Sequence, residues 1–309
     1  MKKLFRILVL VGIASLAPAL SAQDSTEGAG RYDPAVPIEE AFATWQIVDA
    51  HAHFGKAGTF DLPVRTLTDS MDSYGIARAL VSDVEGLEYD GNGKLIPATK
   101  AFTQMQVAKK TVQVVQASKG RLYGLVWIRP HNETVTKEFR DYLKANRKWL
   151  VGLKFHPWHS QLAIDDKKLE PYLALAKELK LPVLVHTSVD DNSLVSHVVN
   201  AAKSHPDVNF LAGHMNMGGD KAEIIAALHD LPNLYGDTAG FFGEEDLLKA
   251  IQTDGAEKLL FGTDAPVGGD DTYAASYRAW DALRSQLTTE QMDNLLHDNA
   301  LRLFGLPPL

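Results

Sequence analysis

The chain has 309 residues, of which 45% are hydrophobic and 23% charged, a composition typical of a folded globular protein. It contains no cysteine, so disulfides, cysteine nucleophiles and cysteine metal ligands are excluded, and any metal must be held by His, Asp, Glu or Lys. The formal net charge is −8. A chain this acidic is a poor ligand for nucleic acid or anionic membranes, so neither is expected as a partner.

The first 22 residues have the three-part pattern of a secretory signal peptide. Lys2, Lys3 and Arg6 precede the apolar run LVLVGIASLAPAL, and the small residues Ser21 and Ala22 follow it. The run is shorter than the ~20 residues of a membrane-spanning helix, which favours cleavage over anchoring. Cleavage after Ser21 or Ala22 would remove three of the 31 cations and none of the 39 acids, leaving 28 − 39 = −11. We therefore expect a periplasmic or secreted protein with no membrane insertion after processing.

Residues 23–46 begin polar and Gly-rich and are predicted to form an N-terminal arm that leads into one domain, residues 47–309. In that domain short apolar runs alternate with amphipathic stretches of helical length. Eight of the runs are strand candidates, and they begin at Ile47, Ile76, Arg121, Leu150, Leu181, Val208, Asn233 and Lys258.

The alternation of eight apolar runs with helical stretches predicts an α/β fold, a single-domain (β/α)₈ TIM barrel. Buried parallel strands are nearly continuous in apolar residues, as these runs are. The alternative is an open doubly wound sheet, but no Gly-rich dinucleotide fingerprint follows the first strand. Two strand-to-helix loops, residues 85–100 and 265–276, belong on the active-site face of such a barrel. We expect them to shape a substrate pocket, with plain solvated loops as the alternative.

Five histidines stand at the C-terminal ends of predicted strands. They are His51, His53, His156, His186 and His214. His51 and His53 are two residues apart, so both side chains point to one face of a strand, and Asp49 continues that spacing. Asp264 ends the eighth strand. Hydrogen bonding at the barrel mouth explains one such histidine, but several that converge with an aspartate predict a shared metal site.

The remaining histidines carry a weaker signal. His197, His205, His229 and His297 fall in predicted helices or at helix ends, where we expect surface or packing roles. His131 and His159 lie just past strand ends, and their roles stay open.

Seven segments resemble the amidohydrolase superfamily, and more narrowly its amidohydrolase-related branch of metal-dependent hydrolases and non-oxidative decarboxylases. They span roughly residues 45–306 in the family's order: IVDAHAHFG, VGLKFHP, LPVLVHTS, LAGHM, LYGDTAG, LLFGTDAP and NALRLFGL. The resemblance implies that His51, His53 and His186 ligate a metal ion, and that Asp264 ligates it or touches its water. It further implies that His214 positions or polarises the attacking water or the substrate.

The cofactor implied by the resemblance is one divalent ion, zinc or alternatively manganese. A catalytic ion of this kind keeps an open position for water and lowers the pKa of that water towards about 7. Asp264 can then accept a proton and pass it to the leaving group, while His214 stabilises developing charge. We therefore predict Asp264 and His214 as the catalytic residues.

Lys154 and His156 share one face of the fourth strand and are predicted to contact an anionic group of a small-molecule substrate. The alternatives for Lys154 are a pair with a nearby acid, or a carbamate that bridges two ions as in binuclear relatives. Arg129, at the end of the third strand, is a further candidate contact for the anion. Trp158 either lines the pocket or packs in the core. Because this strand end is rich in potential cations, we expect one ion and not two.

The first functional hypothesis is a hydrolase that acts on an amide, lactone or ester of a small organic molecule. The second is a decarboxylase of an aromatic or unsaturated acid on the same scaffold. A third class, a catalytically silent metal- or ligand-binding barrel, is disfavoured by the intact set of histidines and aspartate.

Overall fold

The computed structural model describes residues 46–97, 99–240, 244–254, 256–269 and 285–309, with the single positions Ser276, Trp280 and Leu283. The predicted signal peptide, and all of the predicted arm but its last residue, lie outside the described residues. So does half of the predicted loop after the eighth strand, residues 270–275. Within the described ranges, no helix is long and apolar enough to cross a membrane.

Nine strands of the described chain form one sheet, and eight of them are parallel. The parallel strands correspond to the eight predicted runs: β1 (Ile47–Ala57), β3 (Ile76–Asp83), β4 (Leu122–Trp127), β5 (Leu150–Phe155), β6 (Val183–Ser188), β7 (Phe210–Met217), β8 (Leu234–Asp237) and β9 (Leu259–Leu260). The ninth, β2 (Phe60–Leu62), pairs with β1 in an antiparallel hairpin that the sequence did not predict.

The parallel strands follow chain order across the sheet, and backbone hydrogen bonds join its two ends. The N–H of Ala50 donates to the carbonyl of Phe261, and the N–H of His53 donates to that of Ala265, both over 2.8 Å. The N–H of Asp264 donates to the carbonyl of His51 at the same distance. The structure confirms a single α/β domain with a curled parallel sheet, consistent with the predicted TIM barrel.

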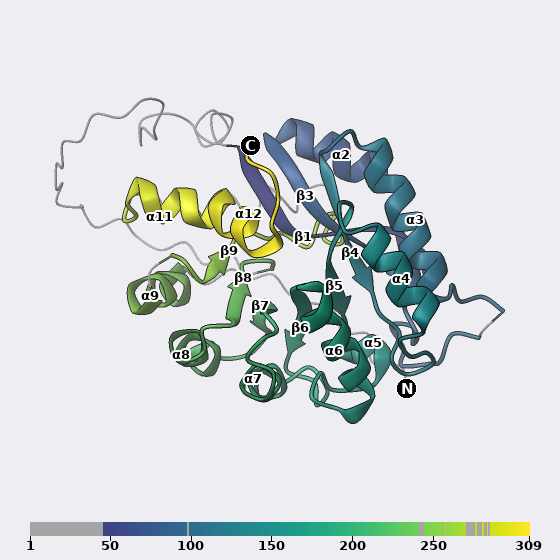
Figure 1. Cartoon of the computed structure of the whole chain (residues 1–309). Coiled ribbons are helices and arrows are strands. Elements are labelled where there is room, and N and C mark those ends of the chain that lie inside the picture. The colour runs from purple at the N-terminus through teal and green to yellow at the C-terminus, as the bar shows by residue number, and fades with distance from the viewer. Residues whose placement is uncertain are drawn as a thin grey trace, which may run out of the picture. The chain divides into compact units, whose positions relative to one another are not determined.

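Helices follow the strands and lie around the outside of the curled sheet (Figure 1). They are α2 (Val64–Ser73), α3 (Gln104–Ala117), α4 (Lys137–Ala145), α5 (Pro157–Ser160), α6 (Glu170–Leu179), α7 (Val195–Ser204), α8 (Ala222–Asp230), α9 (Glu244–Asp254), α11 (Thr289–Asp293) and α12 (Asn299–Phe304). Two short 3₁₀ helices, η1 (Val84–Gly86) and η2 (Lys167–Leu169), and one π-helix, η3 (Asn294–Asp298), complete the helical segments of the described chain.

Local sequence signals explain where the last helical run begins and ends. Thr288 and Gln291 form a capping box, in which each side chain accepts a hydrogen bond from the other residue's backbone N–H. The run ends at Gly305, whose φ of 62° lies in the left-handed region that glycine tolerates best.

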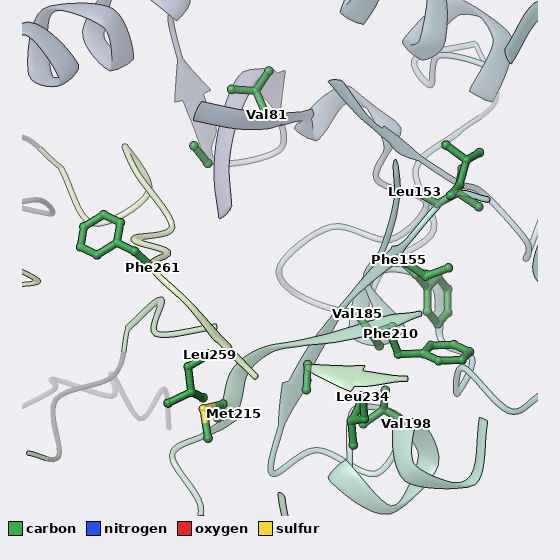
Figure 2. Packing of buried hydrophobic residues seen from close by; sticks show 14 of the residues in the cluster. Val81, Leu153, Phe155, Val185, Val198, Phe210, Met215, Leu234, Leu259 and Phe261 are labelled. Carbon is green, nitrogen blue, oxygen red and sulfur yellow. The ribbon is translucent and has the colours of Figure 1, made fainter. Parts of the chain in front are cut away.

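Most of the buried hydrophobic residues lie in two of the three core clusters. One takes apolar side chains from most of the strands, among them Val48, Leu80 and Leu184, as the interior of a curled sheet requires. The other packs the strands against the helices, with Phe210 and Val198 close together in Figure 2. These two layers hold the strand ends in place, and the functional groups project from those ends.

Strand β1 changes face at a register shift. Its pairing with β3 slips between Asp49 and Ala52. Ala50 belongs to the inner part of the core, whereas Ala52 and Phe54 belong to the outer part. The expectation that Asp49 and the two histidines follow one unbroken alternation is therefore wrong, because a bulge-like irregularity lies between them.

Candidate active site

A cavity of about 200 Å³ lies at the C-terminal ends of the parallel strands. Its lining includes five residues expected at the site: His53, Lys154, His156, His186 and Asp264. It also includes Phe60, Val84, Trp127, His159, Met217 and Val267. A second cavity of about 500 Å³ lies beside the β1–β2 hairpin, but none of these histidines lines it. We place the chemistry in the smaller cavity because the titratable groups converge there.

Three side chains in this region could together hold a metal ion. His51, His214 and Asp264 each offer a ligand atom, and these atoms lie within 4.8 Å of one another. The carboxylate Oδ1 of Asp264 is 2.9 Å from His53 Nε2 and 3.5 Å from His51 Nε2. The structure thus brings three of the expected ligands together, and it adds His214, which was expected to serve chemistry only.

Each of three imidazoles uses its Nδ1 atom to contact a group on the outer side of the site. The contacts are His51 Nδ1 to Asp237 Oδ2 at 2.9 Å, His53 Nδ1 to Ser82 Oγ at 2.8 Å, and His214 Nδ1 to the carbonyl oxygen of Ala239 at 2.8 Å. A histidine held through one ring nitrogen presents the other to a metal, and a carboxylate partner raises its basicity. The donor set therefore fits a divalent ion bound through Nε2 atoms and the carboxylate of Asp264.

The backbone that carries His214 is strained. His214, Met215 and Asn216 have φ angles of 66°, 44° and 76°, and Asp264 has 67°. Non-glycine residues in the left-handed region cost about 1 kcal/mol or more each, and they persist where surrounding contacts fix them. Here the N–H of His214 donates to Asp237 Oδ1 over 2.9 Å. The strain coincides with the two residues predicted to be catalytic.

Burial sets the protonation of the imidazoles and of Lys154. Burial lowers the pKa of His51 well below its usual value, and the neighbouring Lys154 lowers it further. Burial also lowers the pKa of His53. These rings are therefore neutral at pH 7, as metal ligands must be. Lys154 is fully buried with Nζ 2.7 Å from His51 Nε2, and burial lowers its pKa to about 8.

Asp264 is the anionic member of the site. Burial acts to raise its pKa, but the hydrogen bond with His53 and the charges of nearby histidines hold it below its usual value. Its carboxylate is 20% exposed, so it can be reached from the cavity. For Asp237 the effect of burial prevails, and its complete burial raises its pKa.

One wall of the cavity is a stack of flat rings. Trp127 and His156 stack with centroids 5.7 Å apart, and His156 and His186 stack at 3.9 Å. The centroid of His186 is 4.7 Å from that of His214, so this expected ligand lies beside the three-residue group but is not part of it. All three stacked rings line the cavity, so a substrate there meets aromatic side chains.

Two residues predicted to contact the substrate do not line the cavity. Arg129 is buried, and its guanidinium pairs with Glu133 over 2.9 Å and donates to the carbonyl of Phe102. Trp158 lies half-buried in α5, and its neighbour His159 takes the place in the lining. Both residues lie outside the lining because β4 ends at Trp127 and α5 turns the chain after His156, and their contact with a substrate stays a prediction.

Sequence reasoning missed several residues that build the site. Asp237 lies in the segment LYGDTAG, but no role was predicted for it, and none was predicted for Ser82 or Trp127. Asp237 had a usable signal, since it ends strand β8 on the same face of the barrel as the other groups. The four histidines assigned to helices, His197, His205, His229 and His297, lie outside the lining of the cavity.

A curled parallel sheet with histidines and an aspartate at its C-terminal edge defines a β/α-barrel enzyme of the metal-binding kind. The amidohydrolase family matches residues 48–306, and the chain belongs to that family. No curated protein matched the chain by sequence.

Several solved structures share this fold. A 5-carboxyvanillate decarboxylase from Novosphingobium aromaticivorans, with bound manganese and 3-methoxy-4-hydroxy-5-nitrobenzoic acid, is 13% identical with a TM-score of 0.66. The alignment covers 85% of this chain and 98% of that one. A putative 2-pyrone-4,6-dicarboxylic acid hydrolase from Pseudomonas putida is 17% identical with a TM-score of 0.63, over 85% of this chain and 99% of that one.

A third similar structure is an uncharacterized TIM-barrel protein from Bordetella bronchiseptica. It is 18% identical with a TM-score of 0.62, and the alignment covers 84% of this chain and 98% of that one. At identities this low, the three likenesses establish the fold.

Proposed function

We propose that the protein is a metal-dependent hydrolase that cleaves an amide, lactone or ester bond of a small organic anion through a metal-activated water. The observation that carries the proposal is the convergence of His51, His214 and Asp264 within 4.8 Å. The outward Nδ1 contacts of the histidines support it, because they leave Nε2 lone pairs directed to the centre. The 2-pyrone-4,6-dicarboxylic acid hydrolase of similar fold is consistent with it.

We assign one divalent ion to the site, zinc or manganese, held by His51, His53, His186 and Asp264. When bound, such an ion lowers the pKa of water and polarises an oxygen of the substrate. Neutral imidazoles with one carboxylate suit Zn, and a decarboxylase of similar fold binds manganese. A single ion agrees with Lys154, whose Nζ contacts His51 Nε2 and so takes up space near that ligand.

Asp264 is the proposed general base and acid. Its lowered pKa keeps it ionised at pH 7, and its partial exposure lets it take a proton from water and return it to the leaving group. His214 donates its backbone N–H to Asp237 and its Nδ1–H to the carbonyl of Ala239, so its Nε2 is an acceptor that can position the attacking water. Lys154 is the proposed contact for a substrate anion.

The cavity limits the substrate to a small molecule. About 200 Å³ is below the usual range of pockets for drug-sized ligands, and the aromatic rings of Trp127 and His156 form part of its wall. A small planar or unsaturated acid derivative fits that space and that wall.

A substrate panel with product analysis in ¹⁸O-labelled water tests the hydrolase. Lactones, amides and esters of small acids should be cleaved, with one label entering the acid product. Turnover without label in the product, or with release of carbon dioxide, would refute hydrolysis.

The second candidate function is a non-oxidative decarboxylase of an aromatic acid. It is favoured by a protein of similar fold that binds manganese and a substituted benzoic acid. It is also favoured by the cavity lining, in which the buried Lys154 lies with the rings of Trp127 and His156. Carbon dioxide release from hydroxylated benzoic acids, with a solvent proton entering the ring, would establish it in place of hydrolysis.

We also propose that the chain is exported and cleaved near Gln23, since the pattern of residues 1–22 is that of a signal peptide. N-terminal sequencing of protein taken from the producing cell should begin near Gln23. A soluble cytoplasmic product that retains Met1 would contradict export.

A further inference from the structure

We propose that His159 contacts the substrate and accepts a hydrogen bond from a hydroxyl or N–H group next to the reacting bond. This inference rests on the proposed function, because it concerns the same cavity. His159 stands in α5, just after β5, and only 6% of the residue is exposed. Its ring lines the cavity beside His156, with ring centroids 4.4 Å apart. The proposed mechanism does not use it.

The protonation of the His159 ring follows from its one recorded partner. Nδ1 lies 2.7 Å from the carbonyl oxygen of Tyr89. A carbonyl can only accept, so Nδ1 carries the proton and Nε2 has a lone pair in the neutral ring. Burial lowers the pKa of His159, which agrees with a neutral ring at pH 7.

The Nε2 atom of His159 is the ring nitrogen left for a ligand. Among the described residues, none is recorded as a hydrogen-bond partner of this nitrogen. Several polar side-chain atoms of the described chain are fully buried without a partner, and His159 Nε2 is not one of them. A ring nitrogen that is neither paired nor enclosed, in a side chain that lines the cavity, can meet a ligand there.

The loop after β3 fixes His159 from the other side. The backbone N–H groups of Glu88 and Tyr89 both donate to the carbonyl oxygen of His159, over 3.2 and 2.9 Å. Glu88 is itself fully buried and accepts from the N–H of Asn132 over 2.8 Å. The position of the ring is thus set before a substrate enters, so little conformational entropy is lost when it binds.

A hydrogen-bond acceptor such as His159 Nε2, placed among aromatic side chains, favours ligands that carry a hydrogen-bond donor. The ring lies near Phe60 and Trp127, with centroids 6.2 and 6.4 Å away, so few neighbours can satisfy Nε2 once water leaves. A ligand without a donor leaves the nitrogen unpaired, a loss on the order of tenfold in affinity. The expected substrates are therefore hydroxylated acids or amides with an N–H group.

Two substitutions separate the two ring nitrogens of His159. In His159→Asn the side-chain amide N–H can reach the Tyr89 carbonyl as Nδ1 does, but nothing replaces Nε2. In His159→Gln an amide oxygen can reach the position of Nε2, but the contact with Tyr89 is lost. The probes are 2-, 3- and 4-hydroxybenzoate and the three matching methoxybenzoates, with binding to the metal-replete enzyme measured by calorimetry.

We expect at least one hydroxybenzoate to bind the wild type about tenfold more tightly than its methyl ether. His159→Asn should abolish that preference, and His159→Gln should keep part of it. Hydrogen exchange at the Glu88 and Tyr89 amides should change little in His159→Asn, which separates the binding role from a structural one.

The inference is overturned if the wild type shows no preference for any hydroxybenzoate, or if the preference survives in His159→Asn. If His159→Asn does not fold, His159→Gln against His159→Leu decides, because both lack the Tyr89 contact and only Gln offers an acceptor. The probes contain no bond that a hydrolase cleaves, so a failure of the proposed hydrolysis would leave this result readable.

Discussion

Replacing Asp237 by Asn is the sharpest perturbation of the proposed metal site. Asp237 is fully buried, its Oδ2 is 2.9 Å from His51 Nδ1, and its Oδ1 accepts from the N–H of His214 over 2.9 Å. In Asp237→Asn the amide oxygen can keep the contact with His214. The amide N–H₂ then faces His51 Nδ1, and two donors cannot pair. His51 must move its proton to Nε2, which removes the lone pair that would bind the ion.

The expected loss follows from this change of tautomer. Substitution of an outer partner of a metal-bound histidine typically costs 10–100-fold in metal affinity, or about 1.4–2.7 kcal/mol. The measurement is a competition titration of metal-free protein against a chromophoric zinc chelator. Turnover should fall at subsaturating metal and recover in part when metal is in excess.

Asp49→Asn is the matched control. Asp49 is also fully buried at the strand ends, but its recorded contacts are the hydroxyl and N–H of Thr263 and the N–H of His51. It should lower thermal stability more than metal affinity. The reasoning fails if Asp237→Asn binds zinc as tightly as the wild type, or if Asp49→Asn weakens zinc binding equally.

The other predictions concern the reacting groups and pH. Asp264→Asn should lower kcat by about 10²–10⁴-fold if proton transfer is its main task. His214→Asn should lower kcat and keep most of the metal, and loss of the ion from this variant would show that His214 is a ligand. Lys154→Met should raise KM for an anionic substrate about tenfold or more with metal content unchanged, and an unchanged KM would exclude it as the anion contact. Burial raises the pKa of Asp83 from 3.8 to about 7. The folded state therefore holds this proton more tightly than the unfolded state, and wild-type stability should fall as pH rises from about 4 to 7, by up to about 4 kcal/mol. Urea titrations of Asp83→Asn should lack that decline, and an identical pH profile would contradict the burial argument.

The fold was largely predictable because its signals are local. Eight apolar runs bounded by polar segments mark the strands, and parallel strands in a barrel place their C-terminal ends on one face. That rule predicts that His51, His53 and Asp264 lie close together, as they do in the structure. The β1–β2 hairpin was not predicted because β2 has only three residues, although Gly58, with a φ of 59°, opens the two-residue turn.

The side-chain partners were harder to predict, since they depend on where each strand ends and on what packs next to it. β4 stops at Trp127, so alternation no longer decides the direction of Arg129, which pairs with Glu133 instead of facing the cavity. The register shift in β1 likewise breaks the simple spacing between Asp49 and His51. His159 was undecidable from sequence, because its place in the cavity depends on α5 and on the loop that contacts it.

Titration of metal-stripped mature enzyme with zinc or manganese, with turnover of the best panel substrate followed at each addition, tests the central claim most directly. The enzyme should be inactive without metal and fully active near one ion per chain. Its metal affinity should fall only at pH values below 6.5, the usual pKa of histidine, because burial lowers the pKa of His51 and His53. Full turnover in protein shown by elemental analysis to be metal-free would contradict it.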